Sequence, residues 1–173
     1  MIEAAILVIF PFAMAFAIVS DLLSMTIENR VSLILAGSFA ILAPLTGMGW
    51  EIYALHFAAG FAVLTATFCL FAIRAMGGGD AKLMAATALW LGWNIDLIHY
   101  LATASILGGM LTLAILAYRG SPFTVLAGRF EFMDRLAQQG TGVPYGIALG
   151  AAGLLTFPQS PLGGWVLAKL SIL

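Results

Sequence analysis

The stretch AAILVIFPFAMAFAIVSD, residues 4–21, decides the fold class of this chain. It is an apolar run closed by one carboxylate, and a helix that crosses a bilayer needs about 20 predominantly apolar residues. Of the 173 residues, 62% are hydrophobic and only 9% are charged, and mean hydropathy is +1.07. Soluble domains carry roughly 25% charged residues. We therefore expect an all-α membrane protein, and the net charge of −1 argues against a nucleic-acid partner.

Six apolar segments follow one another, and we expect them to form a six-transmembrane-helix bundle in one domain, residues 1–173. The segments are 4–20, 31–45, 53–73, 81–93, 97–118 and 143–157. The fourth is short, and Pro144 suits the first turn of the sixth. A tail over 162–173 either packs along the bundle or extends the last span. Apolar residues three and four apart over 121–139 predict a helix on the membrane surface or packed on the bundle.

Basic residues predict the orientation of the bundle. Six of the seven Lys and Arg residues follow the first, third and fifth segments: Arg30, Arg74, Lys82, Arg119, Arg129 and Arg135. Basic loops stay in the cytoplasm, so we expect the amino terminus outside and these three loops inside.

Two carboxylates then fall on the same side of the membrane. Asp21 ends the first segment and Asp80 begins the fourth, so two crossings separate them. A carboxylate near the bilayer is costly and indicates a functional site. Two together suit aspartic peptidase chemistry, in which an ionised carboxylate takes a proton from water and a protonated one polarises the carbonyl. The structural alternatives are a helix N-cap for Asp80 and a solvated carboxylate for Asp21.

Glycines precede one of the two carboxylates. Gly77, Gly78 and Gly79 allow backbone conformations that other residues avoid, and they let a second chain segment approach closely. Arg74 and Lys82 flank this loop, either as topology signals or as cations that assist ionisation of Asp80.

These motifs resemble a known family. Gly77-x-Gly79-Asp80 matches the GxGD signature of membrane aspartyl proteases, and Asp21 with Asn29 is similar to the first motif of type IV prepilin peptidases. Val143-Pro144-Tyr145-Gly146 resembles a segment of the short members that serve Flp/Tad-type pili. The resemblance extends over nearly the whole chain.

The resemblance implies an aspartic-type endopeptidase of a bacterial or archaeal cytoplasmic membrane. It would remove the leader of a prepilin or pseudopilin precursor after a glycine, on the cytoplasmic side, without a metal or other cofactor. The resemblance makes Asp21 and Asp80 catalytic. It gives supporting or substrate-binding roles to six further residues: Asn29, Gly77, Gly78, Gly79, Pro144 and Tyr145. Larger, bifunctional relatives also methylate the new amino terminus of the cut precursor, and they carry a large first loop with paired cysteines. Cys69 is the single cysteine here, so this N-methylation is not expected.

Two other functions stay open on the sequence. One is a preflagellin or signal-peptide-peptidase-like protease of the same chemistry, and the other is a small proton-coupled transporter with the aspartates as relay groups.

Four further expectations concern packing. His56 and His99 are helix-packing or interfacial residues near the outer ends of spans. Cys69 is a small buried apolar residue. Four aromatic residues form an outer interfacial belt: Trp50, Trp90, Trp93 and Tyr100.

Overall fold

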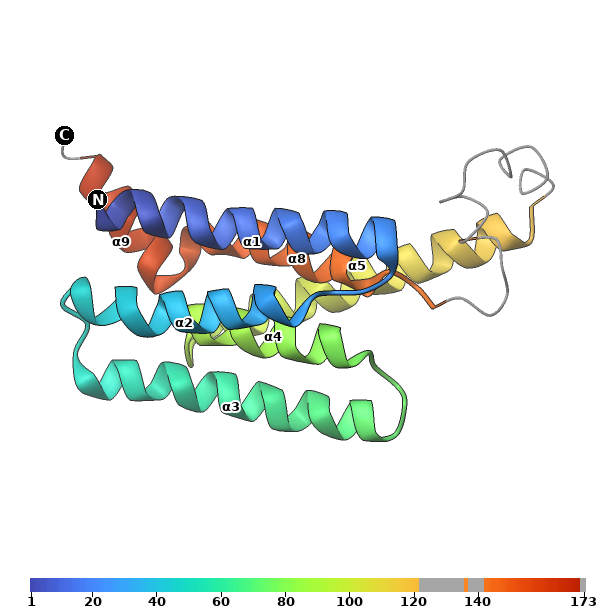
Figure 1. Ribbon diagram of the computed structural model, residues 1–173, viewed down its shortest axis with the longest axis horizontal. Coiled ribbons are helices and arrows are strands. Elements are labelled where there is room, and N and C mark those ends of the chain that lie inside the picture. Colours follow the sequence, from blue (N-terminus) through green and yellow to red (C-terminus); the bar gives the residue numbers. More distant parts are fainter. Residues whose placement is uncertain (122–135, 137–141, 172–173) are drawn as a thin grey trace.

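The structure, a computed structural model, describes residues 1–121, 136 and 142–171, and these residues form helices and connecting turns without a β-strand. The helices are α1 Ile2–Ser24, α2 Asn29–Leu45, α3 Trp50–Ala72, α4 Gly78–Leu91, α5 Ile95–Arg119, α8 Tyr145–Thr156, the 3-10 turn η1 Phe157–Gln159 and α9 Pro161–Leu170. The longer helices run along one long axis, and the start of α1 lies at the same end of the molecule as α9 (Figure 1).

In the part of the chain that the structure describes, three helices are long and apolar enough to cross a membrane: α1 with 23 residues, α3 with 23 and α5 with 25. The other predicted segments are helices as well, but α2 has 17 residues, α4 has 14 and α8 has 12. The all-α class is confirmed, whereas six spans remain a prediction. The tail forms a separate short helix, α9, that packs against α1. The helix expected over 121–139 lies outside the described residues, apart from 121 and 136.

The short helix α4 occupies the centre of the bundle. It packs against α2, α3, α5 and α8, and every residue from Leu83 to Leu91 is buried. A helix that is apolar on all sides is a buried helix, and the neighbouring helices surround α4. Its central position brings its first turn beside the ends of its neighbours.

The aromatic side chains divide between the core and the outer surface. Trp50 and Trp93 are 78% and 62% exposed, as a belt requires. Trp90 and Tyr100 are fully buried, so the belt expectation is wrong for them. The indole nitrogen of Trp90 donates a hydrogen bond of 2.8 Å to the carbonyl oxygen of Leu35 in the neighbouring helix, which satisfies the polar atom that burial would otherwise leave unpaired.

The histidine and cysteine expectations have mixed outcomes. His56 is buried, and its Nδ1 lies 2.8 Å from the carbonyl oxygen of Leu89, so it joins α3 to α4 as a packing residue. His99 is exposed. Cys69 is exposed as well, so its expected burial is wrong. In an apolar bundle the sequence does not separate a core position from a lipid-facing one, because both favour the same residues.

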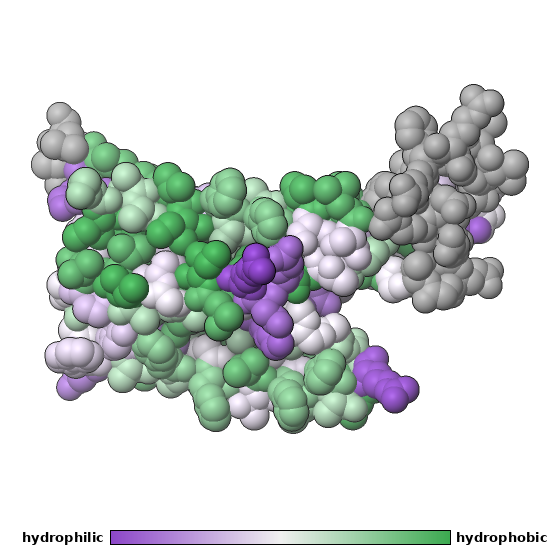
Figure 2. Space-filling view, viewed as in Figure 1, coloured by the Kyte–Doolittle hydropathy of each residue, from purple (hydrophilic) through white to green (hydrophobic). Residues whose placement is uncertain are grey.

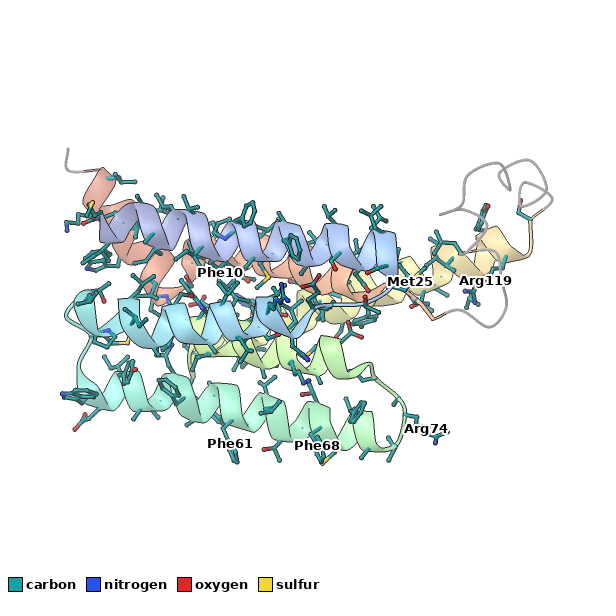
Figure 3. The ribbon with its side chains drawn as sticks, viewed as in Figure 1. Phe10, Met25, Phe61, Phe68, Arg74 and Arg119 are labelled. Carbon is teal, nitrogen blue, oxygen red and sulfur yellow. The ribbon has the colours of Figure 1, made fainter. Side chains whose placement is uncertain are left out.

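Several helix ends meet at one end of the bundle. α1 ends at Met25, whose φ of 54° turns the chain back, and residues 25–28 return to the start of α2. Figure 3 places Met25 at the same end as Arg74, after α3, and Arg119, at the end of α5. The candidate site lies at this end, between the ends of α1 and α3 and the beginnings of α4 and α8.

Candidate active site

Asp21 is buried in the last turn of α1, where it meets the first turn of α8. Its side chain is 4% exposed, and Oδ2 accepts a hydrogen bond of 2.6 Å from the backbone N–H of Gly146. The first N–H groups of a helix have no intrahelical acceptor, and the amino end of a helix favours negative charge. The contact therefore holds one carboxylate oxygen in place and satisfies a donor of α8. The structural alternative for Asp21, a solvated carboxylate, is excluded by this burial.

A glycine at position 146 is needed for this contact. A Cβ atom built there would lie 2.8 Å from Asp21 Oδ2 and 2.7 Å from Ile27 Cδ1. Asp21 Cβ would also lie only 2.9 Å away, and it cannot rotate clear as the two side-chain ends can, so any side chain would push α8 away from α1. Gly146 therefore helps to hold Asp21 in place. The sequence analysis gave a supporting or substrate-binding role only to the two preceding residues, Pro144 and Tyr145.

Asp80 lies at the third position of α4 and turns back on the start of its own helix. The N-cap residue is Gly77, and the Asp80 carboxyl group is hydrogen-bonded to the Gly77 backbone. This is the acidic half of a capping box. The structural alternative for Asp80, the N-cap position, is therefore wrong, because Gly77 occupies that position. The side chain is partly exposed, which leaves it accessible from the neighbouring cavity.

One cavity of about 820 Å³ is lined by both carboxylates. The charges of Asp21 and Asp80 interact with each other across it. Its walls come from residues 25–27 between α1 and α2, from residues 74–80 at the start of α4, and from Phe71, Gly142, Val143 and Tyr145. Two carboxylates that share one cavity form an arrangement able to hold a water molecule and to share a proton.

The glycine run allows close packing rather than an unusual backbone. Gly77 has a φ of −70°, and among the described glycines the positive φ values belong to Gly47 and Gly92. A Cβ atom at Gly79 would lie 3.2 Å from both the Cβ and the carbonyl oxygen of Ile27, and one at Gly78 would lie 3.2 Å from the Phe71 ring. The close-approach expectation is confirmed, and the special conformation is not observed.

Of the remaining residues predicted for the site, only some line the cavity. Tyr145 lines the cavity, and Pro144 is the buried N-cap residue of α8 without lining it. Asn29 begins α2, as expected, but it lies outside this cavity, and its Oδ1 accepts a hydrogen bond of 2.8 Å from Lys82 Nζ. Lys82 is thus paired with Asn29 rather than with Asp80.

Gly108 is a further residue that the sequence reasoning missed. A Cβ atom at this position in α5 would overlap the ring of Tyr145, whereas at the next residue, Gly109, it would meet nothing within 4 Å. Gly108 therefore seats the aromatic ring that lines the cavity. Nothing local in the sequence distinguishes the two glycines, because the difference arises from the packing of α5 against α8.

No cluster of three His, Cys, Asp or Glu side chains that could hold a metal ion occurs among the described residues. Within that part of the chain, the chemistry available at the cavity is that of two carboxylates, a tyrosine hydroxyl, backbone N–H groups and the Arg74 guanidinium at the rim.

Apolar helices around a cavity with two interacting carboxylates define a helical membrane protein with a paired-acid site. Residues 8–113 match the model of the type IV leader peptidase family, and because this match extends over more than half of the chain, the protein belongs to that family. The matched region includes Asp21, Asn29 and residues 77–80 and ends before Tyr145. No curated protein matches the chain, and no solved structure matches it.

Proposed function

We propose that this protein is an aspartic-type endopeptidase that removes the leader from prepilin-like precursors. The observation that carries the proposal is the cavity shared by Asp21 and Asp80 in a chain of the leader peptidase family. The proposal assigns peptide-bond hydrolysis to this pair, with the scissile bond after a glycine at the junction of leader and apolar helix. The same proposal covers the substrate, which would be a precursor of the type that the short family members serving Flp/Tad-type pili cut.

The proposed reaction needs a single water molecule between the two carboxylates. The ionised carboxylate takes a proton from the water as its oxygen attacks the scissile carbonyl carbon. The protonated partner transfers its proton to the carbonyl oxygen, and a tetrahedral diol forms. When the diol collapses, the C–N bond breaks and the leaving nitrogen receives the proton held by the base. One diol hydroxyl returns its proton to the partner carboxylate, and a carboxylic acid and an amine are released. Backbone donors from Gly146 and Gly77 keep the two carboxyl groups in position throughout.

The proposed topology has six spans, with the amino terminus outside and the cavity at the cytoplasmic face. Arg74 and Arg119 lie at the same end of the molecule as the cavity (Figure 3), which agrees with the distribution of basic residues. Because α4 and α8 have 14 and 12 residues, they reach only about 21 and 18 Å along the axis. A cavity at their starts would therefore lie below the level of the longer helix ends, within reach of a substrate that leaves the bilayer.

Cleavage of a synthetic leader peptide by the purified protein in detergent tests the proposal. The peptide should be cut after its glycine in the presence of EDTA, and Asp21→Asn and Asp80→Asn should each abolish the cut. Detergent solution holds no proton gradient, so a proton-coupled transporter would leave the peptide intact. Cleavage that requires a divalent metal, or that survives both substitutions, would remove the dyad mechanism. A preflagellin-type or signal-peptide-peptidase-like enzyme would cut its own class of peptide in preference.

A further inference from the structure

A second groove lies beside the candidate active site and differs from it in character. It has a volume of about 580 Å³ and lies between α2 and α3, with α4 as its floor. Most of its lining is apolar, from Ala36, Phe57, Leu64, Ala85 and Leu89 among others, and only one end carries polar side chains. The polar end is formed by Asn29, Ser32 and Lys82, close in sequence to the residues of the active-site cavity.

The polar end offers hydrogen-bond donors that lack acceptors within the described part of the protein. The ammonium group of Lys82 donates to Asn29 Oδ1 at 2.8 Å and has no carboxylate partner there. An ammonium group has three donors, so two remain free. Ser32 is 9% exposed, and its buried Oγ has no hydrogen-bond partner. A buried hydroxyl without a partner is uncommon in proteins and requires an explanation. These groups together fit an anion.

The polar end of the groove lies inside the level of the α1 end, at a depth where a lysine needs a counter-charge more than it would at the surface. α2 is six residues shorter than α1, 17 against 23, so its first turn lies about 9 Å inside the level of the α1 end when the opposite ends are aligned. Figure 2 shows hydrophilic side chains gathered over the start of α2, in the middle of an otherwise hydrophobic face. A lysine at this depth in a bilayer is costly without a counter-charge.

We propose that this groove binds one anionic phospholipid of the surrounding bilayer. Phosphate oxygens accept hydrogen bonds from Lys82 at the polar end, and one acyl chain lies along the apolar lining toward Leu89. The ligand must combine a negative head with an apolar tail, because the groove combines cationic and apolar parts in that order. A phospholipid anion satisfies both, and it is already present at that depth.

Photolabelling tests the proposal without any measurement of peptidase activity. The purified protein is placed in phosphatidylcholine nanodiscs with a trace of phosphatidylglycerol that carries a diazirine in one acyl chain, and labelled residues are mapped by mass spectrometry. Phe57, Leu64 and Phe68 are all exposed on the same helix, but only the first two line the groove, so label should concentrate on Phe57 and Leu64 rather than on Phe68. Lys82→Gln should lower groove labelling about five-fold, as expected for the loss of one contact between lysine and an anionic lipid.

Matched variants separate this site from general charge and general lipid contact. Arg30→Gln removes the same charge from an adjacent exposed residue that does not line the groove, and it should change labelling by less than about two-fold. Ala36→Phe fills the groove and should abolish its label. Gly37→Phe adds a ring at a position whose Cβ would meet nothing within 4 Å, so the label should stay.

Four outcomes would overturn the proposal. Equal labelling by a phosphatidylcholine analogue would show that the negative charge is not recognised. An equal effect of Arg30→Gln and Lys82→Gln would mean that surface charge alone attracts the lipid. Displacement of the label by inorganic phosphate would point to a free-anion site. Displacement by a peptide with a leader and an apolar segment, without any preference for the anionic lipid, would assign the groove to the substrate helix.

Discussion

Replacement of Gly146 by alanine should damage the site by displacing one helix from one carboxylate. The new Cβ would lie 2.9 Å from Asp21 Cβ, an atom fixed to the backbone of α1, so α8 must retreat by about 0.7 Å to restore ordinary contact. The hydrogen bond of 2.6 Å from Gly146 N–H then lengthens to roughly 3.3 Å, beyond the useful range. A hydrogen bond to a charged group contributes about 1.5–3 kcal/mol.

The expected loss in kcat/KM for leader-peptide cleavage is therefore about 10- to 100-fold. Purified variants are compared by chromatography of the cleaved peptide, with Gly109→Ala as the control because its Cβ would meet nothing within 4 Å. Glycolic acid at position 146, introduced by nonsense suppression, removes the N–H without adding a Cβ and should also reduce the rate at least about five-fold. Wild-type activity in both position-146 variants would refute the role assigned to this contact.

Four other predictions concern the pair, the glycine run, the topology and protons. Asp21→Asn and Asp80→Asn should each lower cleavage by at least about 100-fold while membrane insertion, followed by fractionation, is unchanged; near-normal processing by either variant would exclude it from the pair. Gly79→Val should lose far more activity than Cys69→Ser, because a branched side chain cannot fit against Ile27; equal activity would make the run a mere linker. Arg74→Cys in a Cys69→Ser background should resist an impermeant thiol reagent in whole cells, and labelling would reverse the proposed orientation. Cleavage should follow a bell in pH, with loss at low pH on protonation of the base and loss at high pH on ionisation of the acid; a flat profile would argue against a shared proton.

The breaks between apolar segments were readable from the sequence because turns and charges interrupt the apolar runs. The placement of Asp21 and Asp80 at one end also followed, since it depends only on the number of crossings between them. The roles of Trp90 and Tyr100 did not follow, because apolar and aromatic residues are suited to both lipid and core. A belt is indicated by position along the axis, whereas burial depends on which helix lies in the centre.

The details of the candidate site depend on packing between distant segments, which periodicity does not encode. Gly108 and Gly109 are identical in sequence terms, and only the approach of Tyr145 from α8 distinguishes them. Lys82 was expected to serve either topology or Asp80, and it contacts Asn29 because α2 packs against α4. Gly146 follows Pro144 and Tyr145 in the segment noted from the sequence. Only the position of Asp21 in the structure shows that no side chain fits at position 146.

The contact between Gly146 and Asp21 joins residues 125 positions apart in the chain. The first carboxylate is therefore made well before its backbone donor, which emerges from the ribosome 125 residues later. Until α8 inserts and docks against α1, Asp21 lacks the group that positions it. Premature termination before residue 146 would thus yield a membrane-inserted product with both aspartates but an incomplete site. The order of translation therefore delays completion of the candidate site until α8 has docked against α1.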